Sequence, residues 1–270
     1  MFSNLVVPVD LSKASLDAVV TAAKMAAQVD GHVDAITIVD EPSEVARVSD
    51  ELTRSIERLG PQPVEIRPLV QASHTVVGAI TAHIDENPGS MLLMSSHGRG
   101  RSAAMLGNTV DDVLRAMFGP VIVLGPHATE CSGGLGGTYI VPLDGSTRAE
   151  GVASIVGAWA IEFHGTPWLV EVLDGDAGKV EPAIVQSSYV HTRAHALQQR
   201  IGRDIEFEVL HGRDVGRSIV DFATSQDATL IFMATHGRTG ADRLIAGSAA
   251  ANVVRHATIP VVLFRPPDLK

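Results

Sequence analysis

The chain has 270 residues, 45% of them hydrophobic, and a formal net charge of −10. This length suits two domains of roughly 100 to 150 residues, and the acidic balance excludes a general nucleic-acid or anionic-membrane partner. A single cysteine, Cys131, excludes an internal disulfide and a cysteine-rich metal site. The opening residues lack the pattern of a signal peptide, and no apolar run reaches the roughly 20 residues that span a bilayer. We therefore expect a soluble, cytoplasmic protein.

The first half alternates strand-like apolar segments with helical segments. After the first strand, Leu16, Val19, Val20 and Ala23 recur at helical spacing, which predicts a helix with one buried face. Ser12 is the predicted N-cap of this helix. Strands that alternate with helices favour right-handed crossovers and a parallel, doubly wound α/β sheet. The five predicted strands lie near Leu5–Val9, Val33–Val39, Val64–Val70, Met91–Ser95 and Val121–Leu124.

The second half repeats the order of parts of the first. NLVVPVDLSKAS returns as TYIVPLDGSTRAE, SMLLMSSHGRG as TLIFMATHGRTG, and GPVIVLGP as IPVVLFRP. Several matches in one order at a nearly constant offset indicate a duplication. Ser146 is then the N-cap that corresponds to Ser12. The segment GPHATECSGGLGG has the composition of a flexible linker. We predict domains over residues 1–127 and 138–270, with a linker over 128–137.

Two loops point to a ligand. In an open parallel sheet, ligands bind beyond the carboxyl ends of the strands, where the strand order reverses. After the fourth strand of the second half, Gly237 and Gly247 would allow a positive φ and a close backbone approach. Ser248 would begin a helix, whose free N–H groups favour an anion such as phosphate. The same residues also suit an ordinary turn and cap, and Asp10 and Asp144 after Val-Pro-x equally suit helix capping.

Other chemical motifs are weaker. The pattern G-x-x-x-x-G-K-[ST] is absent, which excludes a P-loop NTPase. His191 and His195 have a spacing that suits zinc, but no third ligand is evident, so we favour exposed histidines. His97 and His236 occupy matched turn positions, and a role in orienting the loop is favoured over acid or base chemistry because no nucleophile is paired with them.

A family resemblance rests on these loops. The pattern Gly-x-x-Gly, nine residues, Gly-Ser/Thr after the fourth strand resembles the ATP-binding signature of the universal stress protein family. The opening Val-Pro-x-Asp and the closing strand resemble that family in both halves. The resemblance implies two flavodoxin-like or HUP-type domains with five-stranded parallel sheets in the strand order 3-2-1-4-5. It also implies that the halves pair through their last strands as an intrachain pseudo-dimer.

The second half keeps more of this signature. Nine residues separate Gly237 from Gly247, although Ala234 stands at the first glycine position. By the resemblance, Asp144 matches the aspartate near the adenine end, and Val172 the strand-two residue whose backbone contacts adenine. The nucleotide-binding residues implied in this half are Pro142, Asp144, Val172, Ala234, His236, Gly237, Gly247, Ser248 and Ala249.

The first half departs further from the signature. Ser95 stands at the first glycine position, only eight residues separate Gly98 from Gly107, and Asn108 replaces the Ser/Thr. We expect a weaker site, because the missing residue shifts the N–H groups that would converge on phosphates. The residues implied in this half are Pro8, Asp10, Ile38, Ser95, Gly98, Gly107, Asn108 and Thr109.

The resemblance implies a stress-response sensor or regulator that binds ATP or another adenine nucleotide, mainly in the second half. Mg²⁺ would accompany the nucleotide, held by phosphate oxygens and water. We expect little or slow hydrolysis and no enzymatic role, because neither a positioned base nor a charge clamp is evident. An unidentified protein partner and a homodimer formed in addition to the pseudo-dimer are further expectations. The alternative is a nucleotide-free protein-interaction module of the same fold, in which Ala234, Ser95 and the shorter first loop close both sites.

Overall fold

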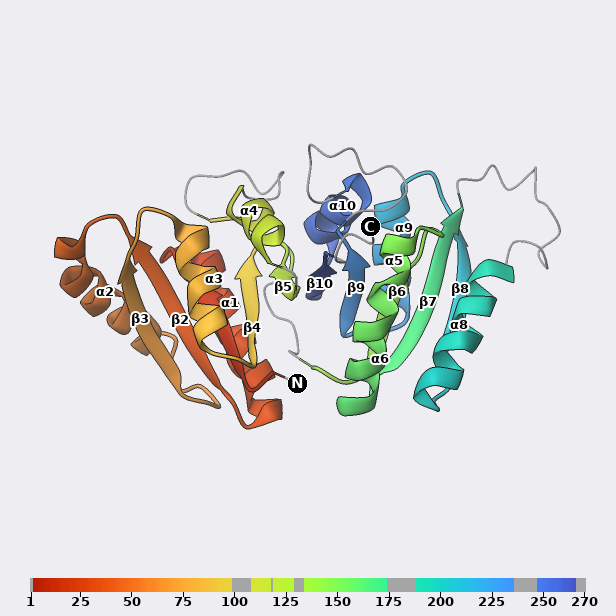
Figure 1. Cartoon of the computed structure of the whole chain (residues 1–270), viewed down its shortest axis with the longest axis horizontal. Coiled ribbons are helices and arrows are strands. Elements are labelled where there is room, and N and C mark those ends of the chain that lie inside the picture. Colours follow the sequence, from red (N-terminus) through yellow and green to blue (C-terminus); the bar gives the residue numbers. More distant parts are fainter. Residues whose placement is uncertain are drawn as a thin grey trace.

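The computed structural model describes residues 2–98, 108–117, 119–128, 134–173, 188–235 and 247–265. The strands of the first half are β1 (Asn4–Pro8), β2 (His32–Val39), β3 (Ile66–Ala72), β4 (Ser90–Ser95) and β5 (Pro120–Leu124). Those of the second half are β6 (Thr138–Pro142), β7 (Thr166–Leu173), β8 (Glu206–His211), β9 (Leu230–Ala234) and β10 (Val261–Phe264). They form one sheet in the order β3-β2-β1-β4-β5-β10-β9-β6-β7-β8 (Figure 1).

Within each half the strand order is the predicted 3-2-1-4-5, and neighbouring strands are parallel. The expectation of two five-stranded sheets is corrected, because β5 and β10 pair antiparallel and join them into one ten-stranded sheet. Each of these strands would otherwise be an edge with unpaired N–H and C=O groups, which the pairing satisfies. The prediction that the halves associate through their last strands is confirmed. We call the whole contact between the two halves, including this β5–β10 pairing, the seam.

Helices cover both faces of the sheet. One face carries α1 (Lys13–Ala26) and α2 (Val45–Glu57) in the first half, and α5 (Thr147–Glu150), α6 (Val152–Glu162) and α8 (Ser188–Ile201) in the second. The other carries α3 (Val76–Glu86), α4 (Asn108–Ala116), α9 (Val215–Ser225) and α10 (Ser248–His256). A short 3-10 turn, η1 (Ala27–Val29), follows α1, and another, η2 (Pro42–Glu44), precedes α2. No described helix has the length and apolarity to cross a membrane.

The start of α1 confirms the predicted cap, since the Ser12 hydroxyl accepts a hydrogen bond from the Ser15 N–H at 3.2 Å. Ser146 caps α5 in the same way, through the Ala149 N–H. The predicted buried face of α1 is partly wrong: Val19 and Ala23 are fully buried, but Leu16 is only partly covered, as is Val20. The fully buried stripe is built instead around alanines at positions 18, 22, 23 and 26, because these short side chains let the helix lie close to the sheet.

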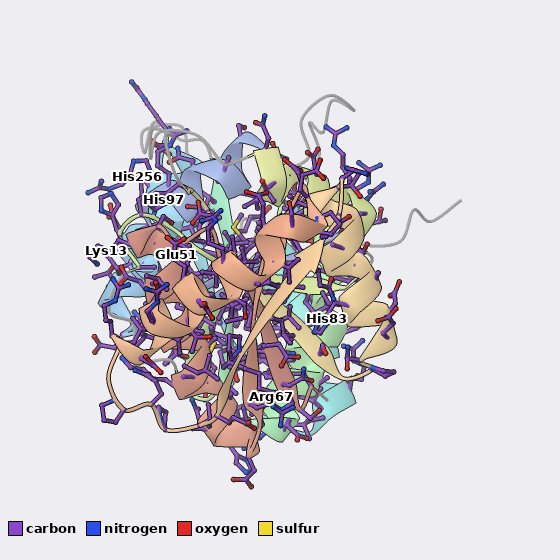
Figure 2. All side chains as sticks on the ribbon, turned by 90° about the vertical axis from the view of Figure 1, so that its left-hand side faces the viewer. Lys13, Glu51, Arg67, His83, His97 and His256 are labelled. Atoms are coloured by element: carbon purple, nitrogen blue, oxygen red, sulfur yellow. The ribbon has the colours of Figure 1, made fainter. Side chains whose placement is uncertain are left out.

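The third predicted strand begins two residues later than expected, at Ile66. Pro61 and Pro63 lie in the segment before it, which forms no strand. A view onto the first half shows its two ends (Figure 2). Glu51 and His97 lie toward the end where β1 and β4 terminate, whereas Arg67 lies near the opposite end.

The seam is reinforced by an aromatic cluster. Phe2 from the first half packs against Trp159 and Phe163 of the second, with ring centroids 5.6 and 5.9 Å apart. The Leu135 N–H also donates to the Gln28 side-chain carbonyl at 2.9 Å, which ties the segment before β6 to the first half. Each face of the sheet has one apolar core that contains residues of both halves. The halves are therefore one packed unit and are not joined by a linker alone.

Candidate functional site

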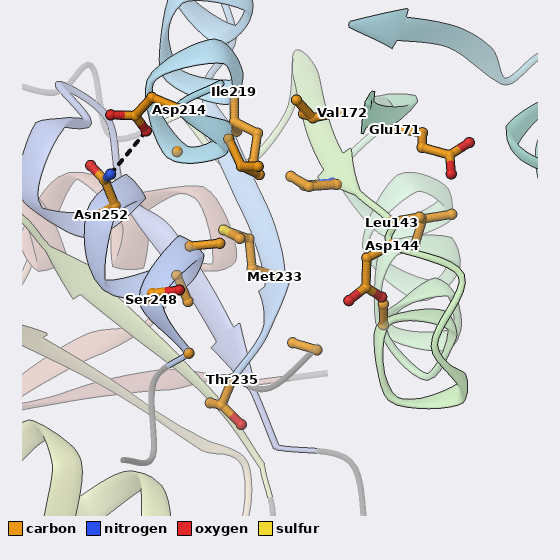
Figure 3. A pocket seen from close by; sticks show the side chains of 18 of the residues that line it. Leu143, Asp144, Glu171, Val172, Asp214, Ile219, Met233, Thr235, Ser248 and Asn252 are labelled. Carbon is orange, nitrogen blue, oxygen red and sulfur yellow. Dashed lines mark hydrogen bonds between the residues drawn. The ribbon is translucent and has the colours of Figure 1, made fainter. Parts of the chain in front are cut away.

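The second half holds a cavity of about 690 Å³ at the carboxyl ends of β6, β7 and β9 (Figure 3). The starts of α9 and α10 form the opposite wall. Seven of the residues predicted for this half line the cavity, namely Pro142, Asp144, Val172, Ala234, Gly247, Ser248 and Ala249. The other two, His236 and Gly237, lie outside the described residues.

Helix α10 begins at the cavity wall without a side-chain cap. The Gly247 N–H donates to the Thr235 carbonyl at 2.7 Å, and Ser248 is exposed. The first turn of α10 contains no acidic residue. The first N–H groups of a helix have no partner within the helix, and together with the helix dipole they attract anions. This corner of the cavity is therefore suited to a negatively charged group.

The expected positive φ at Gly247 is wrong, since its φ is −53°. A Cβ at this position would have the Thr235 carbonyl oxygen as its nearest neighbour, at 3.5 Å, which is an ordinary contact. Glycine is thus not required here by backbone strain. The absence of a side chain at Gly247 leaves room at the wall of the cavity.

Asp144 has a structural role as well as a place on the wall. Its Oδ1 accepts hydrogen bonds from the Ser146 N–H at 3.0 Å and from the Ser146 hydroxyl at 2.6 Å. Asp10 repeats the first of these bonds, with the Ser12 N–H at 3.0 Å. Both aspartates therefore support the start of the helix that follows, while both line a cavity. Helix capping and a place at a ligand site, the two interpretations that the sequence left open for these aspartates, are therefore compatible.

Sequence reasoning missed the residues that α9 brings to the cavity. Asp214 caps α9 through the Arg217 N–H at 3.0 Å and accepts a second bond from the Asn252 amide at 2.9 Å. Both hydrogen bonds lower the pKa of the Asp214 carboxyl, and the bond from the Arg217 N–H has the larger effect. A Cβ at Gly216 would lie 2.7 Å from that of Asn252, so glycine allows α9 and α10 to approach. The Asp-Val-Gly start of α9 could have indicated the cap, but nothing in the sequence indicated its partner.

The first half has a corresponding cavity of about 540 Å³ at the ends of β1, β2 and β4. Among the residues predicted for this half, Pro8, Asp10, Ile38, Ser95, Gly98 and Thr109 line it. Asn108 is the first residue of α4 and is exposed, but it does not contribute to the wall. Gly107 lies outside the described residues.

Two features distinguish this first cavity. A Cβ at Gly98 would collide with Oδ2 of Asp10, so glycine is needed for the turn to lie against that carboxylate. Helix α2 supplies Arg47 and Glu51 to the wall, with 3.4 Å between their charged groups, and Arg47 also pairs with Glu44 at 3.3 Å. No local sequence pattern reveals that α2 borders a cavity, because that depends on how the helix packs.

The universal stress protein family model matches residues 1–125 and, a second time, residues 138–265. The chain belongs to the universal stress protein family. A universal stress protein of Methanocaldococcus jannaschii is 39% identical over 139 residues, which amount to 47% of this chain and 81% of that relative. The duplication inferred from the repeated motifs is thus a tandem of two universal stress protein units.

Solved structures agree with the tandem fold. The crystal structure of a universal stress protein from Archaeoglobus fulgidus has 19% sequence identity and a TM-score of 0.65, over 99% of this chain and 97% of that one. A putative universal stress protein from Pseudomonas aeruginosa has 16% identity and a TM-score of 0.62, over 99% and 94%. At these identities the similarity concerns the fold alone, and it confirms the predicted α/β class.

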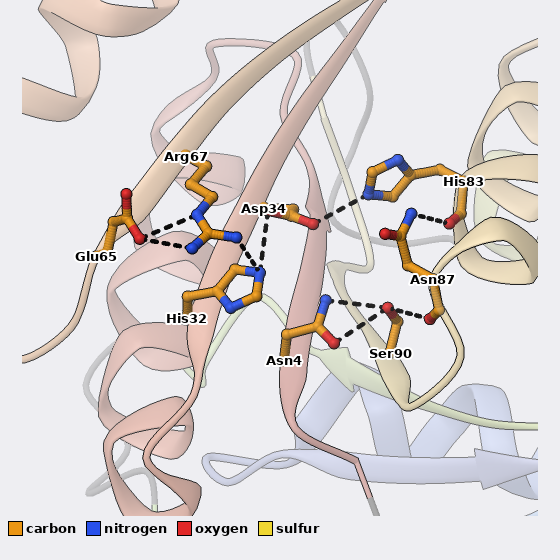
Figure 4. A network of polar contacts seen from close by, with 8 residues as sticks. All are labelled: Asn4, His32, Asp34, Glu65, Arg67, His83, Asn87 and Ser90. Atoms are coloured by element: carbon orange, nitrogen blue, oxygen red, sulfur yellow. Dashed lines mark hydrogen bonds and ion pairs between the residues drawn. The ribbon is translucent and has the colours of Figure 1, made fainter.

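A third group of polar residues in this universal stress protein lies at the opposite end of the first half (Figure 4). Asp34 and His83 are 5% and 8% exposed, and His83 Nε2 lies 3.1 Å from Oδ2 of Asp34. His32 Nε2 lies 3.4 Å from the other Asp34 oxygen and 3.0 Å from the Arg67 guanidinium. Glu65 in turn binds Arg67 at 2.8 Å, which lowers the pKa of the Glu65 carboxyl. None of these side chains lines either cavity.

The histidines weighed for zinc lie on α8, where the His191 ring packs against Phe207 with centroids 5.0 Å apart. Within the described ranges, no three acidic, histidine or cysteine side chains are grouped closely enough to hold a metal ion. In the first half, the carbonyl of His97 accepts a bond from the Ser95 hydroxyl at 2.9 Å, and its Nδ1 lies 3.4 Å from the Ser96 hydroxyl. His97 is therefore held by the turn around it.

Proposed function

We propose that this universal stress protein binds ATP or another adenine nucleotide, chiefly in the cavity of its second half, and acts as a stress-response sensor or regulator. The observation that carries the proposal is the start of α10, which opens on the cavity without a side-chain cap and without an acidic residue in its first turn. Such a helix start attracts phosphate. The family membership supports the same assignment.

The walls of the cavity fit the two ends of a nucleotide. Val172, Ile219 and Met233 make one part of the wall apolar, which suits a planar base. Gly247 and Ser248 lie at the helix start that suits phosphate. Asp144 lies across the cavity from Ser248 (Figure 3) and can accept a hydrogen bond from the base or the ribose. Mg²⁺ would be held by phosphate oxygens and water, because no described cluster offers it a cage of ligands.

The proposal includes slow turnover at most. Two of the acidic groups on the wall hold helix starts, Asp144 through Ser146 and Asp214 through the Arg217 N–H. A dedicated phosphotransferase uses a positioned base and a cluster of positive groups around the transferred phosphate. Occupancy of the cavity, more than chemistry within it, would then be the signal that a protein partner or a second copy of the chain detects in the cytoplasm.

The test is calorimetric titration of the full chain with AMP and ATP in the presence of Mg²⁺, for the parent and for Gly247→Val. The added side chain occupies the room that Gly247 leaves at the wall, so we expect the affinity to fall at least ten-fold. Gly119→Val is the matched control, because a Cβ there meets no atom within 4 Å and Gly119 does not line either cavity. Circular dichroism and thermal unfolding confirm that both variants are folded.

Saturable binding by the parent and by Gly119→Val, with the loss confined to Gly247→Val, supports a nucleotide site in the second half. Equal binding by all three proteins would show that the nucleotide binds at a site other than the cavity of the second half. A folded parent that binds neither nucleotide overturns the proposal and favours the nucleotide-free interaction module.

A further inference from the structure

The sheet ends on two strands, β3 in the first half and β8 in the second (Figure 1). Within the described part of the chain, neither strand has a neighbour on its outer side. Such an edge presents N–H and C=O groups that can bind a strand of another molecule, and proteins protect edges with proline or with charged side chains. The two edges of this sheet differ in that protection.

The edge of β3 is blocked by a proline. The Ser73 N–H donates to the Val39 carbonyl of β2 at 2.9 Å. Because the direction of the backbone groups alternates along a strand, Pro68, five residues earlier, faces outward. Proline has no N–H, so the middle of this edge cannot form a continuous ladder with another strand. Helix α2 also packs mainly on β3, so it lies over this edge strand.

The edge of β8 has a phenylalanine where β3 has its proline. Pro68 is paired with the fourth residue of β2, and Phe207 with the fourth residue of β7, so the two positions correspond in the repeat. Phe207 is 36% exposed, although the His191 ring packs against it. No residue of β8 is buried. Helix α8 is shared between β7, β8 and α6, so it covers the edge strand less than α2 does.

Three residues of β8 direct their backbone groups outward. The Gly212 N–H donates to the last carbonyl of β7 at 3.1 Å, so the alternation turns Phe207, Val209 and His211 to the outer side. The Val209 N–H agrees with this, because it donates at 3.1 Å to the carboxylate of its neighbour Glu208. A carboxylate on a flexible side chain can move aside when a strand binds, whereas a proline cannot acquire an N–H. The protection of β8 is therefore reversible.

The side chains of β8 favour a second copy of the same strand as the occupant. The strand begins with two acidic residues, Glu206 and Glu208, and ends with His211. An antiparallel copy places the acidic start of each strand beside the histidine end of the other, whereas a parallel copy would align the acidic residues. The seam already shows this mode of association, since β5 and β10 of two similar units pair antiparallel.

Charge and hydrogen bonding select one register for this pair. In a continuous sheet, residues that lie opposite each other point to the same face, so a two-fold axis passes through one residue of β8. An axis at Glu208 sets two carboxylates opposite each other and pairs only two of the three outward residues. An axis at Val209 lets all three exchange hydrogen bonds. It also sets Phe207 opposite His211 of the second copy.

We propose that the outer edge of β8 binds a second copy of this chain, antiparallel and centred on Val209, so that two ten-stranded sheets continue into one. A single pair of strands is a small contact, so the association is reversible and depends on concentration. This inference goes beyond the proposed function and does not rest on it, because none of the outward residues of β8 lines either cavity.

The experiment is sedimentation equilibrium of the full chain without nucleotide, up to millimolar concentration. Phe207→Pro gives β8 the proline that β3 has. By symmetry the dimer loses two hydrogen bonds and two ring contacts, so we expect the association to weaken at least about ten-fold. Phe207→Thr keeps the N–H and should weaken the association less. Ile161→Ser is the control, because it removes a 54% exposed apolar side chain from α6 and should leave the dissociation constant unchanged.

Glu208→Ala should act in the opposite direction. It frees the Val209 N–H from the carboxylate that competes with the second copy, so the association should tighten about two-fold to five-fold. Circular dichroism and thermal unfolding confirm that each variant is folded.

Hydrogen exchange of the parent is a second measurement that needs no substitution. The outward amides of Phe207, Val209 and His211 should gain protection as the protein concentration rises. Those of Ile66 and Val70, which face outward on β3, should not. A parent that stays monomeric at millimolar concentration, a dimer that Phe207→Pro does not weaken, or a dimer without protection of the three amides would overturn the inference.

Discussion

The two halves make the same contact between a strand and a helix with different kinds of side chain, polar in the first half and aromatic in the second. The third residue of β2 is Asp34, and it meets His83, the eighth residue of α3, as a buried acid–imidazole pair 3.1 Å apart. The third residue of β7 is Trp168, and it meets Phe222, the eighth residue of α9, edge to face with ring centroids 5.5 Å apart and an interplanar angle of 65°. These positions correspond in the repeat.

The fold therefore requires a contact between this strand and this helix, but not a particular kind of contact. Aromatic side chains meet the requirement by burying apolar area, whereas the polar pair must be fully hydrogen-bonded to be tolerated. In the first half, His32 contacts the Asp34 carboxylate and Arg67 contacts His32. The aromatic pair of the second half needs no such network. The first half should accordingly be the more sensitive to changes in charge, and the second to changes in volume.

The largest effect is expected at Trp159, which is 3% exposed and stacks on Phe2 of the first half. Trp159→Ala leaves a cavity at the seam and should cost about 3–5 kcal/mol of unfolding free energy. Urea denaturation of the full chain measures the loss. Ile161→Ala on the same helix is the control, because Ile161 is 54% exposed and its truncation should cost less than about 0.5 kcal/mol. A similar loss in both variants would contradict the role of Trp159 at the seam.

The polar pair can be replaced by apolar residues like those of the second half. Asp34→Leu alone leaves His83 buried without its acceptor and should cost about 1–3 kcal/mol. Adding His83→Phe removes the orphaned imidazole, so the double variant should return to within about 1 kcal/mol of the parent.

Chemical denaturation of the two single variants and the double variant gives the coupling energy between the pair. Glu65→Ala is the control at the exposed edge of the same cluster, where the loss should be much smaller than that of Asp34→Leu because solvent screens an exposed ion pair. Strictly additive losses at Asp34 and His83 would show that the pair does not act as a unit.

The glycines at the two cavities should differ in their tolerance of a methyl group. Gly98→Ala forces the new Cβ against the Asp10 carboxylate, and overpacking of this kind costs about 1–3 kcal/mol. Gly247→Ala makes only an ordinary contact at 3.5 Å, and the loss of a glycine N-cap should cost less than about 1 kcal/mol. Thermal unfolding measures the loss of stability in each variant. A larger loss for Gly247→Ala than for Gly98→Ala would show that Asp10 moves aside freely.

The smallest effects concern two aspartates near helix starts, with opposite signs. Burial raises the pKa of the Asp111 carboxyl in α4, so its ionised form weakens the fold as the pH rises through the interval from its ordinary pKa to its raised one. Hydrogen bonds from the Arg217 N–H and from Asn252 lower the pKa of Asp214. Its contribution to stability is therefore present above the ordinary pKa and is lost as the pH falls through the lowered one.

At pH 7, Asp111→Asn should therefore raise the melting temperature slightly, and Asp214→Asn should lower it slightly. Both differences should shrink on acidification, the one for Asp111 as the pH falls through its raised pKa, and the one for Asp214 only as the pH falls from the ordinary pKa toward the lowered one. Melting temperatures of the parent and the two variants between pH 3 and pH 7 provide the measurement. A difference that persists unchanged at pH 3 would mean that shape, and not charge, sets the effect.

Much of this architecture follows from local sequence. The repeat, the alternation of strands and helices, the caps at Ser12 and Ser146, and the glycine loops with their family resemblance each depend on residues that are near one another in the chain. Capping, periodicity and turn chemistry operate over a few residues, so their signals survive in the sequence alone. The predicted positions that line the two cavities next to strand ends could be named for the same reason, whereas those on α2 and α9 could not.

Tertiary structure decided the rest, because it depends on contacts between distant segments. The merger of two sheets into one requires β5 to meet β10, the Asp34–His83 pair joins a strand to a helix 49 positions further along, and Asn252 reaches Asp214 across 38 positions. Helix α2 borders a cavity only because of how it packs on β2 and β3. Register and helix packing set these distances, and no short-range pattern encodes them.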